Sequence, residues 1–212
     1  MPHPISIVLA DDHPLLLKGL SDLVSSEDGF MVAGTASDGP AALSLIELAR
    51  PDIAVLDLSM PGISGLGVLK EIARGQGGVK TVFLTAMISD DEIVEAMAAN
   101  VWGILLKESA PEALIDCLRE VAGGRKWLPA DLVHPALSRR AKRDEDGTAL
   151  QMLTPRERQI ADLVCEARSN KEIAGMIGMS AGTVRIHLHN IYVKLQVGNR
   201  TALATMMLNN RA

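Results

Sequence analysis

The sequence predicts an α/β domain, built on a doubly wound parallel sheet, followed by a small all-helical domain. Short, continuous apolar runs alternate with amphipathic helical segments through the first 125 of the 212 residues. Parallel strands covered by helices on both faces have this apolar composition, and the alternation is typical of a doubly wound sheet. After residue 147 the strand-like runs give way to closely spaced helix start signals. We therefore expect the all-helical domain in the last part of the chain.

Five segments are predicted to be the strands of the sheet. They are residues 5–10, 31–36, 53–56, 81–84 and 104–106. Right-handed crossovers between parallel strands leave few topologies, and the flavodoxin-like order 2-1-3-4-5 is the commonest for five strands. We therefore expect that order.

Five amphipathic helices are predicted to alternate with these strands. They are expected at residues 15–24, 40–48, 66–72, 93–98 and 111–121. Apolar residues recur in them at the spacing of one helical face, as Leu114, Ile115, Leu118 and Val121 do in the last one. Because a pair of glycines at 123–124 ends the series, residues 1–125 are expected to form one domain.

Polar residues stand at the ends of four predicted strands. Asp11 and Asp12 follow the first strand, Asp57 follows the third, Thr85 the fourth and Lys107 the fifth. The carboxyl ends of parallel strands meet at one edge of a doubly wound sheet, where such folds bind ligands. One acidic residue at a strand end is ordinarily a solvated loop residue, whereas the complete set is expected to form a site.

The chemistry of this set suits a divalent metal ion and a phosphoryl group. Mg²⁺ prefers oxygen ligands and would relieve the repulsion among three close carboxylates. A carboxylate can also act as a nucleophile and form an acyl phosphate. Lys107 would bring positive charge to the equatorial oxygens of a phosphoryl group, and Thr85 would donate its hydroxyl to one of them.

Residues 126–147 are interpreted as a linker, in which 130–137 can form a short helix. They mix prolines, a basic cluster and an acidic run. The net charge changes sign here, because residues 1–125 hold 8 Lys and Arg against 18 Asp and Glu, whereas residues 126–212 hold 13 against 8. An acidic part joined to a basic part suggests a metal-binding or regulatory module fused to a module that binds a polyanion.

Residues 148–212 are predicted to contain four helices with clear start signals. The expected N-caps are Thr154, Ser169, Ser180 and Asn199. The first two begin capping boxes, because a glutamate follows each three residues later. Only a short turn, Gly178-Met179-Ser180, joins the second and third helices. Two short helices joined in this way form a helix-turn-helix unit, whose second helix enters the major groove of DNA.

The third of these helices is expected to read DNA. Its apolar stripe of Val184, Leu188, Ile191 and Leu195 would face the core, which leaves outward the side chains of Arg185, Ile186, His189 and Asn190. Arginine can pair with guanine edges or phosphate, asparagine with adenine, and isoleucine with thymine methyls. Lys171, Thr183 and Lys194 are expected to contact phosphates and set the register. Any one of these residues could equally belong to a solvated helix face.

Four segments of the first domain occur together in one known family. They are VLADDH (8–13), PDIAVLDLSMPG (51–62), LTA (84–86) and GILLK (103–107). Through them, residues 1–125 resemble the receiver domain of bacterial two-component response regulators. The resemblance implies phosphorylation of Asp57 by a sensor histidine kinase, with Thr85 and Lys107 contacting the phosphoryl group. It also implies a Mg²⁺ site formed by Asp11, Asp12, Asp57 and the Ser59 carbonyl.

Two residues depart from the receiver pattern. Ile104 stands where family members usually carry an aromatic residue, often tyrosine, and Asn100 replaces a common glycine. The aromatic residue that reports phosphorylation in many receivers is therefore missing. We expect the chemistry at Asp57 to survive both changes, whereas the usual signalling route is in doubt.

Further segments of the second domain match another family. They are LTPRER (153–158), SNKEIA (169–174), TVRIH (183–187), KL (194–195) and NRT (199–201). Residues 153–203 thus resemble the LuxR-type helix-turn-helix, and the whole chain resembles a NarL/FixJ-type response regulator. Residues 153–203 depart from the LuxR-type pattern at two places. These are Ala167-Arg168, where glycine usually ends the first helix, and His189, where lysine or arginine is common.

The combined resemblance implies a transcription factor rather than an enzyme, one that binds double-stranded DNA as a homodimer. In this family the final helix, at about residues 201–208, commonly forms the dimer contact on DNA. Its small and apolar face, Ala202, Leu203, Met206 and Met207, is expected either to form that contact or to cover its own domain.

Two other functions stay open at this point. One is a phosphate-independent regulator that uses the receiver only as a dimerisation scaffold. Ile104 keeps this alternative open, whereas the intact set of Asp11, Asp12, Asp57, Thr85 and Lys107 argues against it. The other is a Mg²⁺-dependent phosphatase with Asp57 as nucleophile, which lacks support because residues 1–125 hold no insertion that could cap a substrate.

The cellular location is expected to be the cytoplasm. Cys117 and Cys165 have no metal spacing and are too few for a disulfide framework. The N-terminus has no signal-peptide pattern, and no apolar run reaches the roughly 18–20 residues of a membrane span.

Overall fold

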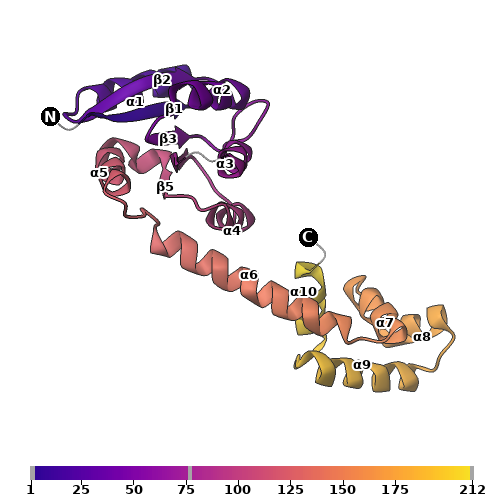
Figure 1. The fold of residues 1–212 in the computed structure, drawn as a ribbon. Helices are drawn as coiled ribbons and strands as arrows, with labels where there is room; N and C mark the ends of the chain where they lie inside the picture. The colour runs from indigo at the N-terminus through magenta and orange to yellow at the C-terminus, as the bar shows by residue number, and fades with distance from the viewer. Residues whose placement is uncertain (1–2, 76–77, 211–212) are drawn as a thin grey trace. The chain divides into compact units, whose positions relative to one another are not determined.

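The computed structural model describes residues 3–75 and 78–210, and the chain forms two compact units that divide between Leu137 and Ser138. The first unit contains a sheet with helices on both of its faces, and in the described residues the second unit is entirely helical (Figure 1). The expected fold class, α/β followed by all-α, is confirmed. Within the described ranges, no helix is both long and apolar enough to cross a membrane.

All five strands of the first unit are parallel and follow the predicted order, β2-β1-β3-β4-β5. The strands are β1 (Ile5–Ala10), β2 (Phe30–Ala36), β3 (Ile53–Leu56), β4 (Lys80–Thr85) and β5 (Gly103–Leu106). Every residue of β3, the central strand, is buried, because neighbouring strands cover its edges and helices cover both faces. All five carboxyl ends lie at the same edge of the sheet.

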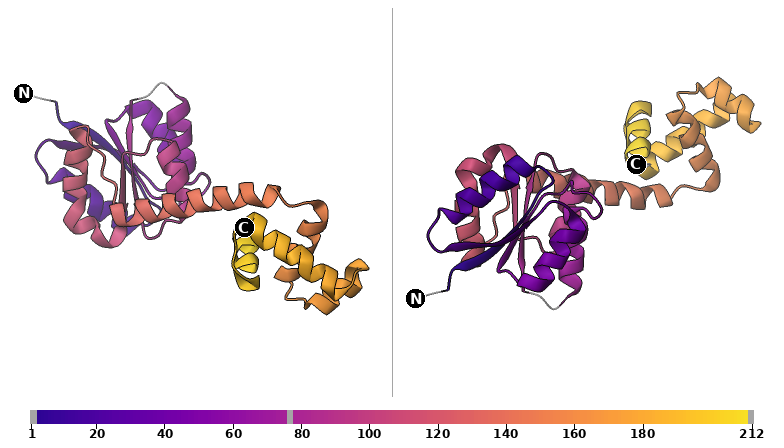
Figure 2. Two further views of the ribbon diagram at one scale, coloured as in Figure 1. Left: turned by 90° about the horizontal axis from the view of Figure 1, so that it is seen from below. Right: turned by 90° about the horizontal axis from the view of Figure 1, so that it is seen from above.

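Helices cover the two faces of this sheet as separate layers (Figure 2). One layer holds α1 (Pro14–Ser25) and α5 (Ala110–Ala122), and the other holds α2 (Gly39–Ala49), α3 (Gly65–Arg74) and α4 (Asp90–Ala98). The predicted apolar stripe of α5 is completely buried at Leu114, Leu118 and Val121 and partly buried at Ile115. A single 3-10 turn, η1 (Lys107–Ser109), joins β5 to α5.

The segment after α5 carries more regular structure than the sequence suggested. Helix α6 runs from Ala130 to Gln151, far past the short helix expected at 130–137, and Pro135 lies inside it. In its exposed middle, Arg140 Nε lies 3.1 Å from Asp144 Oδ1. This i, i+4 ion pair stabilises the exposed helix, and the basic cluster followed by acidic residues is its sequence signal.

The second unit holds α7 (Pro155–Cys165), α8 (Asn170–Ile177), α9 (Ala181–Leu195) and α10 (Arg200–Asn209). All four predicted N-caps are confirmed, because each of the four side chains accepts a hydrogen bond from the first turn of its helix. The glutamates of the two capping boxes, Glu157 and Glu172, each accept a hydrogen bond from the backbone N–H of the N-cap residue. These helices enclose one apolar core, to which the end of α6 contributes Leu150.

Candidate functional site

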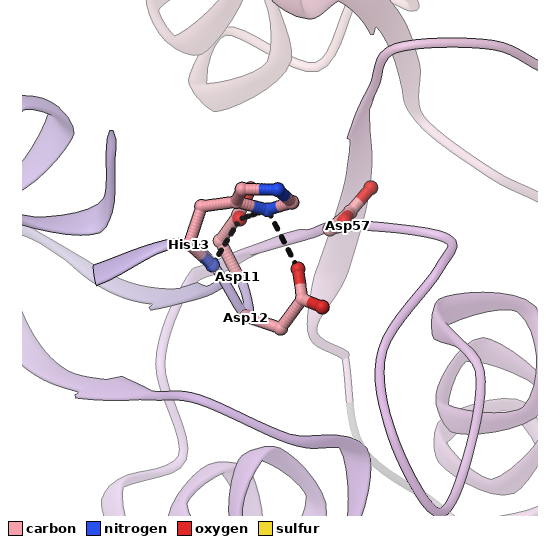
Figure 3. Close-up of side chains that lie close together, drawn as sticks. All are labelled: Asp11, Asp12, His13 and Asp57. Carbon is pink, nitrogen blue, oxygen red and sulfur yellow. Dashed lines mark hydrogen bonds and ion pairs between the residues drawn. The ribbon is translucent and has the colours of Figure 1, made fainter. Parts of the chain in front are cut away.

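Two buried carboxylates lie side by side because β1 and β3 pair in register. Ala10 is opposite Leu56, so the residues that follow them, Asp11 and Asp57, stand at neighbouring positions. Only 1% of Asp11 and 3% of Asp57 is exposed. Asp12 comes from the same turn as Asp11 but is partly exposed. Figure 3 shows the three aspartates close together, with Asp11 behind His13.

Lys107 brings its ammonium group to two of these carboxylates. Its Nζ lies 2.9 Å from Asp57 Oδ2 and 2.7 Å from Asp11 Oδ2. Burial by itself would lower the pKa of Lys107, but hydrogen bonds to Asp11 and Asp57 and the charges of both outweigh burial and raise that pKa above its usual value. The lysine therefore stays protonated at neutral pH and holds a fixed positive charge beside Asp57.

Thr85 is the last residue of β4 and is almost completely buried. Its hydroxyl donates to the Met87 carbonyl at 2.8 Å, and the Met87 N–H donates back to Thr85 Oγ1 at 3.4 Å. A hydroxyl has one hydrogen to donate. Thr85 can therefore donate to a phosphoryl oxygen only after it releases Met87.

His13 belongs to the same cluster, although no role was predicted for it from the sequence. Its Nδ1 lies 2.7 Å from Asp12 Oδ1 and 3.2 Å from Asp11 Oδ1, and its backbone N–H donates to Asp11 Oδ1 at 2.9 Å (Figure 3). Asp11, Asp12, His13 and Asp57 each offer a ligand atom, and these atoms all lie within 4.8 Å of one another. The one signal in the sequence is the position of His13 directly after the two aspartates.

The donor set fits a hard divalent cation. Asp12 Oδ1 is buried and accepts no hydrogen bond from the described residues, although His13 lies within ion-pair distance, whereas Asp11 Oδ2 pairs with Lys107 at 2.7 Å. Buried oxygens without hydrogen bonds cost free energy, which a bound cation would remove. Ser59, whose carbonyl was expected to be a further ligand, is an exposed residue of the loop after β3.

The first residue of α3 packs closely against the backbone of Asp57. A Cβ atom added at Gly65 would lie 2.3 Å from the backbone oxygen of Asp57, so only glycine fits there. Ser64 caps α3 by accepting a hydrogen bond from the Gly67 N–H. Close packing thus fixes the backbone on the carboxyl side of Asp57.

The two receiver departures have clear structural settings. Asn100 ends α4 with φ of 62°, in the left-handed region that glycine and asparagine tolerate best. Ile104 is completely buried in the core cluster that contains Phe83. An aliphatic side chain in that position has no polar group that could turn towards Thr85.

A second candidate site is the exposed face of α9. The predicted apolar stripe of this helix is buried, and Arg185, Ile186, His189 and Asn190 are all exposed, with Ile186 63% exposed. Lys171 on α8 is exposed as well. An arginine, an asparagine and an apolar side chain together on one helix can contact base edges in a major groove.

Two residues expected to contact phosphate have partners within the second unit. Lys194 Nζ lies 2.6 Å from Glu157 Oε2, and the Oγ1 of Thr183 lies 2.8 Å from Ser180 Oγ. Burial would raise the pKa of Glu157, but the hydrogen bonds from Lys194 and Thr154 outweigh it and lower that pKa. Lys194 therefore neutralises a buried carboxylate, and contact between Lys194 and DNA remains a prediction.

The apolar face of α10 covers its own domain. Leu203, Met206 and Met207 are buried in the core of the second unit, with Ala202 partly buried beside them. Of the two roles expected for this face, the structure supports the internal one. Leu208, by contrast, is 52% exposed.

Comparisons with known proteins match both parts of the chain. Residues 7–119 match the family described as "response regulator receiver domain", and residues 151–207 match "bacterial regulatory proteins, luxR family". The nitrate/nitrite response regulator protein NarL of Escherichia coli (strain K12) is 32% identical over 210 residues, which cover 98% of this chain and 97% of NarL.

Solved structures agree with these matches. The response regulator ChrA of a heme-sensing two-component system is 34% identical, with a TM-score of 0.55 and 98% of both chains covered. The response regulator RcsB in complex with DNA is 25% identical, with a TM-score of 0.59, and the match covers 98% of this chain and 99% of RcsB.

Proposed function

Because the chain belongs to the NarL-type response regulators, DNA-binding proteins with a receiver domain followed by a LuxR-type domain, we propose that phosphorylation of Asp57 by a sensor histidine kinase controls its binding to DNA. The observation that carries this proposal is the ion pair between Lys107 Nζ and Asp57 Oδ2 at 2.9 Å. It links a buried carboxylate nucleophile to the cation that a transferred phosphoryl group requires.

In the proposed reaction, a carboxylate oxygen of Asp57 attacks the phosphorus atom of a phosphohistidine on the kinase. The new O–P bond forms as the P–N bond breaks, and the electron pair of that bond goes to the imidazole nitrogen of the kinase. Lys107 then pairs with a phosphoryl oxygen instead of with the free carboxylate. Thr85 releases the Met87 carbonyl and donates its hydroxyl to another phosphoryl oxygen.

Receiver domains generally bind Mg²⁺ at an acidic site, and the buried oxygens of Asp11, Asp12 and Asp57 suit that ion here. When bound, Mg²⁺ would neutralise charge on the carboxylates and on the phosphoryl oxygens. We propose the Ser59 carbonyl as a further ligand.

At the DNA end, we propose that the exposed face of α9 enters the major groove. Arg185, Ile186, His189 and Asn190 would face base edges, while Lys171, Thr183 and Lys194 would contact phosphates. A second copy of the chain would occupy the other half of the DNA site. The family is one of transcriptional regulators, so the first unit serves regulation rather than turnover of a free substrate.

The proposed phosphorylation site is tested by labelling the full-length protein with a small phosphodonor, with and without Mg²⁺. Intact mass should increase by one phosphoryl group in the wild type only when Mg²⁺ is present. Asp57→Asn should abolish the increase, because an amide cannot form the acyl phosphate. Asp52→Asn is the matched control, since Asp52 lies at the other edge of the sheet, where it bonds to Ser6. Undiminished labelling of the Asp57→Asn protein would disprove the assignment.

A further inference from the structure

The loop between β4 and α4 connects the proposed phosphorylation site to helix α6 by direct packing. Ile88 follows Met87, the residue whose carbonyl holds the Thr85 hydroxyl. Its partly buried side chain packs in a small cluster formed by Ile93 of α4 with Val133 and Ala136 of α6. Ile88 therefore links the backbone next to Met87 to the side chains that pack α6 against α4.

The same loop residue also touches the main core of the first unit. Ile88 packs, together with Met97 and Leu128, against the cluster that contains Phe83 and Ile104. The chain just before α6 is fixed to the sheet, because the Ile104 N–H donates to the Trp127 carbonyl at 2.9 Å. The start of α6 is thus an integral part of the first unit.

Helix α6 takes part in the cores of both units. Val133 and Ala136 near its start are 5% and 0% exposed in the first unit, and Leu150 at its end is 3% exposed in the core of the second. Residues 137–142 between them are all exposed. The chain that joins the two cores is thus the exposed middle of α6.

Resting on the proposed function, we propose that Ile88 and the first two turns of α6 carry the effect of phosphorylation to the DNA-binding unit. Donation of the Thr85 hydroxyl to a phosphoryl oxygen removes its hydrogen bond to Met87, so the loop that carries Ile88 changes conformation. Close-packed clusters shift between discrete arrangements rather than deforming continuously. The packing of Ile88 against the cluster of Ile93, Val133 and Ala136 therefore changes, and the packing of α6 against α4 changes with it. Ile104 cannot supply the usual route, because it is aliphatic and fully buried.

The test uses the full-length protein with Ile88→Ala and a matched control, Ile115→Ala. Ile115 is also partly buried, but it lies on α5 and packs against the opposite face of the sheet. Three quantities are measured with and without phosphodonor: intact mass, DNA affinity, and amide hydrogen exchange in residues 130–137. We expect exchange in 130–137 to change on phosphorylation of the wild type and of Ile115→Ala, and both should gain affinity.

The Ile88→Ala protein should take up the phosphoryl group as the wild type does. It should show no change of exchange in α6 and a gain in affinity of less than about twofold, well below the usual 5- to 150-fold coupling range. Leu132→Ala truncates the α6 side of the same cluster and should give the same loss, which guards against misfolding of the loop variant. A phosphorylated Ile88→Ala protein that keeps the full gain would overturn the inference. A wild type that takes up no phosphoryl group would overturn the proposed function, and this inference with it.

Discussion

Arg185 is the α9 side chain whose chemistry bears most directly on sequence recognition. It is exposed on the same helix face as Ile186, and arginine is the residue that most often reads guanine. The other α9 cation, Lys194, is a poor probe of DNA contact, because truncating it would leave the buried carboxylate of Glu157 without its counter-charge.

We expect Arg185→Ala to weaken binding to the preferred DNA site by roughly 1–3 kcal/mol and to relax one position of that site. The site is first obtained by selection from random duplexes, and affinity is then measured by fluorescence anisotropy. Lys171→Ala is the control for a phosphate contact, and it should weaken all sequences alike and reduce the salt slope by about 1. Unchanged affinity and sequence preference in Arg185→Ala would mean that recognition lies elsewhere on the domain.

Single residues of the first site were predictable because parallel-sheet geometry is simple. A polar residue directly after each buried strand reaches the same edge, so Asp11, Asp57 and Lys107 follow from strand ends alone. His13 was not predictable in this way, since its contacts depend on how the turn before α1 folds. The pair of Lys194 with Glu157 joins residues 37 positions apart on different helices, and no local pattern marks it.

At the scale of elements, the starts of the helices in the second unit could be predicted from local sequence alone. The four predicted N-caps of the second unit all form, because a cap is decided by residues within one turn. Helix α6 exceeded its prediction, since exposed polar helices lack the apolar stripe on which helix assignment relies. Its burial at both ends depends on tertiary packing that the sequence does not display.

The end of α7 carries a stored local strain. Arg168 N–H donates to Leu163 O and Ala167 N–H donates to Val164 O, which is a Schellman ending. Ala167 occupies its left-handed position with φ of 58°, where glycine is usual. A Cβ atom in this conformation costs about 1–2 kcal/mol. Glycine would remove this cost, but it would offset part of the gain because it loses more conformational entropy on folding.

We therefore expect Ala167→Gly to raise the free energy of unfolding of the second unit by about 0.5–1 kcal/mol. Urea unfolding followed by circular dichroism at 222 nm reports the helices of both units. Tryptophan fluorescence reports the first unit alone, because Trp102 and Trp127 both lie there, and it should not change. Gly178→Ala makes the opposite change at a φ of 68° after α8 and should destabilise the same unit. A stability loss in Ala167→Gly would contradict the strain argument.

At the scale of the whole molecule, the central quantity is how strongly phosphorylation shifts the binding equilibrium. A phosphoryl group can shift a population only by the difference in free energy with which it stabilises the two states. Ile104 stands where family members usually carry an aromatic ring, and it is aliphatic and completely buried in the core, so it cannot turn a ring towards Thr85. The proposed route through Ile88 and α6 involves few side chains, so we expect a coupling free energy of only about 1–2 kcal/mol.

This small coupling predicts a leaky switch. The unphosphorylated protein should bind DNA measurably, and phosphorylation should raise its affinity roughly 5- to 30-fold. Titrations of the full-length protein with and without phosphodonor measure the gain, and Asp57→Asn should bind like the unphosphorylated wild type in both. Fragment 138–212, which corresponds to the second compact unit, should bind DNA with an affinity that the phosphodonor does not change. No detectable binding before phosphorylation, followed by tight binding after it, would contradict the leaky switch. The coupling free energy would then be larger than about 1–2 kcal/mol, even though the aromatic residue is missing.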